Sequence, residues 1–184
     1  MSEKEKMLAG ELYDANYDKE LIKDRYEAKD ICFEYNNLKP SDFDGKDRII
    51  KKLFAKTGKQ IIVEQNFWCD YGYNIFVGEN FYMNHNCTIL DGAKVEFGDN
   101  VFVAPNCGFY TAGHPLDYET RNKGLEYAKP IKIGNNVWIG GNVIVLPGVN
   151  IGDNVVIGAG SVVNKDIPSN SMAVGIPCKV IKKI

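Results

Sequence analysis

The sequence predicts a mostly β solenoid that follows a short helical segment, and three observations support this prediction. Apolar residues recur every six positions through most of the second part of the chain. A sustained period of six fits neither the 3.6-residue period of a helix nor the two-residue period of a simple strand. Residues 1–60 instead carry apolar side chains at helical spacing, and a polar stretch over residues 111–130 interrupts the six-residue count.

Length and composition are ordinary for one globular domain. The chain has 184 residues, of which 45% are hydrophobic and 25% charged, and its net charge of -2 gives no general basic patch that would favour nucleic-acid binding. The N-terminus lacks the apolar stretch of a signal peptide, and no apolar run is long enough to span a membrane. We therefore expect a cytoplasmic protein with no nucleic-acid or membrane partner.

The five cysteines contain no CxxC pair, and an odd number without a secretion signal favours reduced thiols over a disulfide framework. Neither of the two histidines has a cysteine at ligand spacing, so the sequence predicts no metal site.

The helical N-terminal segment, residues 1–60, is predicted to contain two or three short amphipathic helices. Pro40 separates the two apolar runs, and Ser41 or Asp42 is expected to cap the later helix. The runs are Leu21, Ile22 and Tyr26, followed by Ile49, Ile50, Leu53 and Phe54.

The six-residue repeat predicts a triangular prism over residues 61–184, in which each hexad forms one short strand and one corner. One apolar side chain per hexad points inward, and glycine or asparagine at the corners relieves the strain of positive φ. A β-sandwich is the alternative, but it would not sustain this period. The predicted inward residues are Val77, Met83, Ile89, Val95, then after a two-residue slip Phe97, Val103 and Phe109, and finally Ile133, Ile139, Val145, Ile151, Ile157 and Val163.

The polar stretch 111–130 is predicted to be a long loop inserted into the solenoid, and such loops are usually functional. His114 lies in a Gly-His-Pro turn where this loop leaves the prism. The residues alone leave two roles open for His114, because it could act as a catalytic base or simply end a strand.

Several segments together resemble the maltose and galactoside O-acetyltransferases, a branch of the hexapeptide-repeat acyltransferases. They are NIFVGENFYMNHNCTILD, YTAGHPLDYETRNKG, IGNNVWIGGNVIVLPGVNIGDN and VIGAGSVVNKDIP, and the opening MSEKEKMLAGELYDA is more similar to the maltose enzymes. The resemblance implies a left-handed parallel β-helix and acetyl-CoA-dependent transfer to a sugar hydroxyl without a metal. It also implies a homotrimer with active sites between subunits.

Individual positions inherit expected roles from this resemblance. The catalytic histidine matches His114, Asn84 matches an asparagine that shapes the site, and Asp70 and Asp14 match acidic contacts to the sugar. The positions implied for CoA are Trp138, Gly141, Ala159, Asn164, Lys165, and, in the C-terminal tail, Lys179 and Lys182.

The chain departs from the family pattern at three places. Gly92 stands where galactoside enzymes have a second aspartate, which favours a maltose-type acceptor. Gly141 replaces a serine, so a role there must use the backbone N–H. Lys179 and Lys182 stand where arginines often occur, and a lysine holds phosphate as a point charge.

The expected chemistry needs a general base for the hydroxyl and a donor for the oxyanion that develops on the thioester carbonyl. Histidine suits the first task, and a backbone N–H at the Gly140-Gly141 corner suits the second. A covalent acetyl-enzyme would instead need a nucleophile beside His114. Cys107 is near in sequence, but its position in the hexad leans inward, so the sequence favours direct transfer.

Simpler roles remain open for several residues. His85 is expected at a corner or a subunit contact, Trp138 could be an ordinary interface aromatic, and the KVIKKI tail could be a solvated basic end. Other acceptors, such as galactosides, chitin-like oligosaccharides or an antibiotic, and a non-catalytic scaffold are the competing functions. Four aromatic residues could pack in an interface or contact a sugar: Tyr71, Tyr73, Phe81 and Tyr82.

Overall fold

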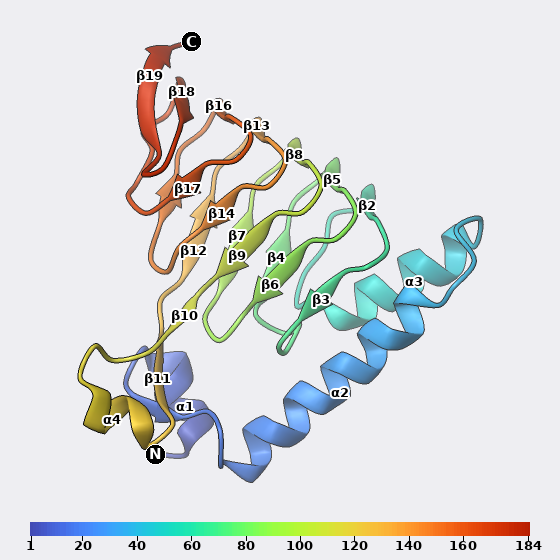
Figure 1. Ribbon diagram of the computed structural model, residues 1–184. Coiled ribbons are helices and arrows are strands. Elements are labelled where there is room, and N and C mark those ends of the chain that lie inside the picture. The colour runs from blue at the N-terminus through green and yellow to red at the C-terminus, as the bar shows by residue number, and fades with distance from the viewer.

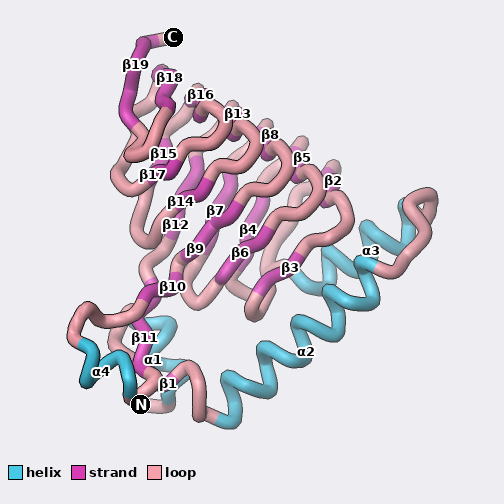
Figure 2. Tube along the Cα trace, viewed as in Figure 1, coloured by secondary structure: helices cyan, strands magenta, loops and turns pink.

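The computed structural model describes residues 1–184 and shows a left-handed β-helix with a helical N-terminal segment at its base (Figure 1). The coils stack so that strands from successive coils pair in parallel. Figure 2 shows the short strands separated by turns along the whole prism. None of the helices is both long and apolar enough to cross a bilayer.

The N-terminal segment contains three helices, as the sequence predicts: α1 (Glu3–Ala9), α2 (Lys19–Asn36) and α3 (Phe43–Leu53). Asp42 caps α3, because its side chain accepts a hydrogen bond from the backbone N–H of Gly45. The expectation that Tyr26 faces the core is wrong, since its side chain is 64% exposed. The buried stripe of α2 runs along another face, through Leu21, Ala28, Cys32 and Tyr35.

Three sheets form the faces of the prism. The polar face contains β4 (Ile75–Val77), β7 (Val95–Phe97), β12 (Ile131–Ile133) and β15 (Asn150–Ile151). The apolar face contains β2 (Ile61–Val63), β5 (Phe81–Met83), β8 (Val101–Val103), β13 (Val137–Ile139), β16 (Val155–Ile157), β18 (Ser171–Val174) and the antiparallel β19 (Lys179–Lys183). The loop-bearing face contains β3 (Trp68–Cys69), β6 (Thr88–Leu90), β9 (Gly108–Tyr110), β14 (Ile144–Val145) and β17 (Val162–Val163).

Every residue that the six-residue count placed inside the prism is buried, so this part of the prediction is confirmed. The two-residue slip is a longer turn after β6. It accommodates the extra residues without changing the pairing of Val77 with Phe97 on neighbouring coils. The interior is one continuous hydrophobic cluster that extends from α2 and α3 to the last coils.

The corners use asparagine and glycine for different purposes. All nine non-glycine residues with positive φ are asparagines. Corner glycines such as Gly98 and Gly140 have no positive φ, and they are required by space instead. A Cβ on Gly140 would lie 2.6 Å from the backbone nitrogen of Ala159, and one on Gly98 would lie 2.8 Å from the carbonyl carbon of Gly134. The sequence-based explanation, positive φ for both residue types, is therefore wrong for these glycines.

The inserted stretch 111–130 is not an irregular loop. It contains β10 (Ala112–Gly113), α4 (Tyr118–Asn122) and β11 (Leu125–Ala128). Figure 2 shows α2 and α3 beside the first coils, and α1 and α4 beside β10 and β11. Strand β11 pairs antiparallel with β10 on one side and with β1 (Tyr13–Asp14) on the other. The N-terminal segment and the inserted loop thus share a three-stranded sheet and a small core, composed of Met7, Tyr13, Ala15, Leu21, Tyr71, Ala93 and Ala128.

Candidate active site

The predicted site residues gather mainly at two corners of the prism, one on each side of the loop-bearing face. The loop corner comprises the segments that follow its strands, residues 70–74, 91–94, 111–130, 146–149 and 164–166. The glycine corner comprises the turns that precede them, residues 64–67, 84–87, 104–107, 140–143 and 158–161. His114 and Asp70 lie at the loop corner, whereas Asn84, Gly141 and Ala159 lie at the glycine corner.

His114 is held in one orientation at the loop corner. Its Nδ1 lies 3.2 Å from the backbone carbonyl oxygen of Leu125. Because a carbonyl oxygen can only accept, Nδ1 carries the proton, and in the neutral imidazole Nε2 then presents its lone pair. The side chain is 48% exposed, so a substrate can reach Nε2. This is the tautomer that a general base needs.

Glu126 of β11 lies beside the histidine, and the sequence analysis did not single it out. Its Oε1 is 3.6 Å from Nε2 of His114, and the phenol of Tyr13 donates a hydrogen bond of 3.2 Å to its Oε2. Only the pairing of β1 with β11 brings Tyr13 to this place. No spacing in the sequence reveals that pairing, because the two strands are far apart in the chain.

Asp70 lies on the same corner, in the turn after β3. Burial raises the pKa of its carboxyl group above the ordinary value, and the nearby guanidinium of Arg25 opposes this shift. Arg25 donates hydrogen bonds to the phenol of Tyr71, at 2.8 Å, and to the backbone carbonyl of Ala15. Arg25 therefore ties helix α2 to the turn that presents Asp70.

The carboxyl group of Asp91, which is fully buried, stabilises the turn that contains Asp70. One oxygen of Asp91 accepts hydrogen bonds from the backbone N–H groups of Asp70 and Tyr71, at 3.0 and 2.9 Å. Burial raises the pKa of Asp91 to about 7, although the backbone hydrogen bond from Tyr71 acts in the opposite direction. Asp91 fixes the turn and does not itself face solvent.

Asp14 lies at the end of β1, opposite Leu125 of β11. One of its carboxylate oxygens accepts hydrogen bonds from the N–H groups of Asn16 and Tyr17, at 3.1 and 2.9 Å. The side chain therefore shapes the local turn beside the strand that holds His114.

At the glycine corner, one backbone donor of the Gly140-Gly141 pair is free. The N–H of Gly140 is taken, because it donates to the carbonyl of Ile157 at 2.8 Å. The N–H of Gly141 has no acceptor within the chain. Of the pair that the sequence suggested for the oxyanion, only Gly141 can serve.

The space around this corner suits an extended ligand. A Cβ placed on Gly160 would meet nothing within 4 Å, and one on Gly141 would meet only the carbonyl oxygen of Pro105 at 3.4 Å. The Cys107 thiol is buried at the same corner and donates to the carbonyl of Gly140 at 3.2 Å. This placement agrees with the inward position expected for Cys107.

Asn84 and His85 occupy the glycine corner one coil below residues 104–107. The side-chain oxygen of Asn84 accepts a hydrogen bond of 2.7 Å from the backbone N–H of His85. His85 is exposed, and its Nδ1 lies 3.3 Å from the backbone carbonyl of Gln65. Asn84 and His114 thus lie on opposite sides of the loop-bearing face.

The outward side chains of the apolar face form a continuous row. Its members pair in register from coil to coil: Ile62, Tyr82, Phe102, Trp138, Val156 and Met172. Trp138 is 57% exposed and Phe102 is 42% exposed. Two of the aromatics considered for an interface do not fit that role, because Tyr71 and Phe81 are buried within the chain.

The remaining residues expected at CoA lie on exposed turns and on the last strand. Ala159, Asn164 and Lys165 are exposed in the last coils, and Lys179 and Lys182 are exposed on β19. None of these three lysines forms an ion pair within the chain. Their charges are therefore available to an anionic ligand.

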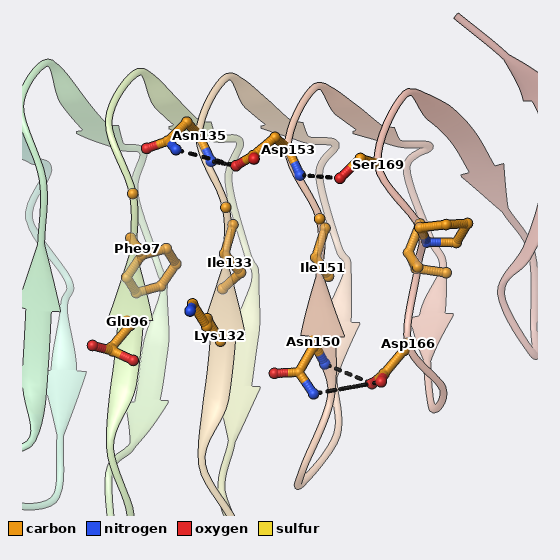
Figure 3. A pocket seen from close by; sticks show the side chains of 15 residues that line it. Glu96, Phe97, Lys132, Ile133, Asn135, Asn150, Ile151, Asp153, Asp166 and Ser169 are labelled. Atoms are coloured by element: carbon orange, nitrogen blue, oxygen red, sulfur yellow. Dashed lines mark hydrogen bonds between the residues drawn. The ribbon is translucent and has the colours of Figure 1, made fainter.

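A groove of about 780 Å³ runs along the polar face and contains none of the predicted site residues (Figure 3). The side chains at its corner accept hydrogen bonds from backbone N–H groups of the neighbouring coil. Asp153 accepts from the backbone N–H of Asn135 at 2.6 Å, and Ser169 accepts from that of Asp153 at 2.9 Å (Figure 3). We attribute this groove to the shape of the solenoid and not to the site.

The repeat, the inserted loop and the two corners define a class, the hexapeptide-repeat acyltransferases, and comparison with known proteins places the chain in it. Residues 130–165 match the family described as "Bacterial transferase hexapeptide (six repeats)". Residues 6–58 match the "Maltose acetyltransferase hexapeptide capping motif". The chain belongs to the maltose and galactoside acetyltransferase branch of this class, and it is an acetyltransferase by family.

Three similar proteins span almost the whole chain. The Saccharomyces cerevisiae protein named "Putative acetyltransferase YJL218W" is 59% identical over 98% of this chain and 92% of its own length, and its name gives no acceptor. The structure of a maltose O-acetyltransferase from Clostridium difficile 630 matches with a TM-score of 0.98 and 58% identity, covering 100% of this chain and 98% of the other. A galactoside acetyltransferase in complex with coenzyme A matches with a TM-score of 0.96 and 46% identity, covering 100% and 92%.

Proposed function

We propose that this protein transfers the acetyl group of acetyl-CoA directly to a hydroxyl of a small sugar, of the maltose or glucose type. The observation that carries the proposal is the hydrogen bond from Nδ1 of His114 to the carbonyl of Leu125, which leaves Nε2 as an accessible base. The two similar solved structures, a maltose enzyme and a galactoside enzyme bound to coenzyme A, support the donor and the acceptor class.

In the proposed reaction, the thioester of acetyl-CoA supplies an activated acyl group. Nε2 of His114 takes the proton of the sugar hydroxyl while the hydroxyl oxygen forms a bond with the carbonyl carbon. The free N–H of Gly141 donates to the oxyanion, the C–S bond then breaks, and the histidine returns the proton to the thiolate. Lys165, Lys179 and Lys182 hold the phosphates of the donor, and Asp70 accepts from the sugar.

The buried Cys107 argues against an acetyl-enzyme. Its thiol lies inside the prism and donates to a backbone carbonyl, so it is not placed to attack the thioester. Incubation with acetyl-CoA alone, followed by intact-mass spectrometry, should therefore give unmodified protein. A stable mass increase of one acetyl group on Cys107 would replace direct transfer with a covalent mechanism.

We also propose that the protein is a homotrimer with sites between subunits. The row of exposed aromatic and aliphatic side chains on the apolar face supports this, because a continuous apolar patch of that kind usually marks an interface. Sedimentation analysis should give a trimer. A stable monomer that still turns over acetyl-CoA would refute the assembly.

The histidine assignment is tested with a matched pair of variants. His114 and His85 are both exposed, and each has Nδ1 near a backbone carbonyl, but only His114 lies beside the loop. His114→Ala should lower turnover at saturating acetyl-CoA by about 10²- to 10⁴-fold, whereas His85→Ala should retain most of it. Equal activity of the two variants would show that His114 is not the base.

The acceptor is tested by measuring acetyl-CoA turnover across glucose, maltose, galactosides and chitin-like oligosaccharides. We expect the highest kcat/KM with glucose or maltose. A preference for galactosides would identify the protein as a galactoside acetyltransferase and refute the maltose-type assignment. No turnover with any acceptor would favour a binding or scaffold role and would refute the proposed activity.

A further inference from the structure

The carboxylate of Glu126 is fixed beside the candidate base by two strands. It belongs to β11, the central strand of the sheet β1-β11-β10, so its backbone is paired on both sides. The side chain is 19% exposed, which shields it from bulk water but leaves it open to a ligand. Residues on doubly paired strands are held more precisely than residues on free loops.

Tyr13 fixes one oxygen of this carboxylate and leaves the other free. Burial raises the pKa of the Tyr13 phenol, so the phenol keeps its proton and donates to Oε2 of Glu126 at 3.2 Å. Oε1 has no hydrogen-bond donor within the chain and lies 3.6 Å from Nε2 of His114. Arg25, Asp70 and Tyr71 are the other titratable groups whose charges act on this cluster.

Gly92 provides the space in which Tyr13 reaches Glu126. A Cβ on Gly92 would lie 3.0 Å from the phenol oxygen of Tyr13 and 3.2 Å from the Cβ of Ala128. A side chain at position 92 would therefore compete with the phenol for the same place.

We propose that Glu126 is a specificity-determining residue. His114 deprotonates one hydroxyl of the sugar, and the free oxygen of Glu126 accepts a hydrogen bond from a second hydroxyl of the same sugar. The inference rests on the proposed function, because it takes His114 as the base. Two acceptor atoms 3.6 Å apart can each receive one of two neighbouring hydroxyl groups. The acceptor class that fits is a polyol or sugar with a second free hydroxyl near the acetylated one.

The test combines variants of the protein with variants of the sugar. Acetylation at saturating acetyl-CoA is measured for the wild-type protein with glucose and with each of its monodeoxy analogues. The analogue that lacks the reacting hydroxyl gives no product, and this result identifies the hydroxyl that is acetylated. One further analogue should lose about 10- to 100-fold in kcat/KM, the range for a hydrogen bond to a charged group.

Glu126→Gln should show that same loss with intact glucose, and no further loss with the sensitive analogue, because enzyme and sugar each lack one partner of the same hydrogen bond. Tyr13→Phe and Gly92→Ala should give smaller losses with the same dependence on the sugar. Glu96→Gln is the matched control, since Glu96 is a partly exposed carboxylate that pairs with Lys94 on the polar face. It should behave as wild type with every sugar.

Two results would overturn the proposal. Glu126→Gln could leave kcat/KM unchanged with glucose, or it could lower activity by one common factor with all sugars, which would indicate a structural role. Both results are distinct from failure of the proposed function, in which the wild-type protein would acetylate no sugar at all. Thermal unfolding of each variant identifies losses that come from misfolding.

Discussion

Replacing Gly140 by alanine should destabilise the protein, whereas the same change at Gly141 should not. The added Cβ at position 140 would lie 2.6 Å from the backbone nitrogen of Ala159 and 2.9 Å from the carbonyl oxygen of Ile157. Both atoms belong to the next coil, and that carbonyl accepts the N–H of Gly140 at 2.8 Å. Relief of the clash must separate two paired coils. At position 141 the nearest atom is 3.4 Å away, and the backbone has no positive φ.

The magnitude follows from the cost of inserting one methyl group into a closely packed region, about 1–3 kcal/mol. For a chain of this size, each kcal/mol lowers Tm by about 2–4 °C, so Gly140→Ala should lower Tm by about 2–12 °C. Circular dichroism melting at one fixed protein concentration measures this, because assembly would make Tm concentration-dependent. Equal Tm values for the two variants would refute the argument that corner glycines are required by space.

Two further predictions concern charge. Replacing Lys165 and Lys182 by alanine should raise KM for acetyl-CoA without changing KM for the sugar, and the increase should shrink at high salt; an unchanged KM would remove these lysines from the donor site. For Asp91, burial raises the pKa to about 7 in the folded chain, whereas an unfolded aspartate has a pKa of about 3.9. The folded state therefore holds the extra proton, and this group makes the free energy of unfolding fall as pH rises from 4 to 7. Urea titrations across that range should show a weaker fall for Asp91→Asn than for the wild-type protein, and identical pH slopes would contradict the assignment.

The prism could be predicted because the six-residue spacing that defines it can be recognised within short stretches of sequence. Each inward side chain recurs at a fixed spacing, so Ile133 and Val145 could be assigned to the core without knowing which strands pair. The role of the corner glycines could not be predicted, because close approach and positive φ select the same residue. Only the positions of neighbouring coils distinguish the two causes at Gly140.

The inserted loop could be located but not described. Its central strand β11 is stabilised by pairing with β1, where Tyr13 lies opposite Glu126. These two segments come together only when the chain folds. Local propensity carries no information about a partner so distant in sequence. For the same reason His114 could be proposed from its turn, whereas Glu126 and its hydrogen bond with Tyr13 could be found only in the structure.

The separation of the candidate residues between two corners bears on how the site is completed. His114 and its acidic neighbours lie at the loop corner, while the free N–H of Gly141 lies at the glycine corner, on the other side of the loop-bearing face. A base and an oxyanion donor must act on one carbonyl within hydrogen-bond distance of both. Outward side chains such as Trp68, Thr88 and Ile144 lie between the two corners of one chain. A second copy that presents its glycine corner to the loop corner of the first would bring the two groups together. The test mixes His114→Ala with a second variant whose glycine corner is inactive. Mixed oligomers should recover part of the activity, because the intact loop corner of one chain can meet the intact glycine corner of the other. No recovery in confirmed mixed oligomers would place the whole site on one chain.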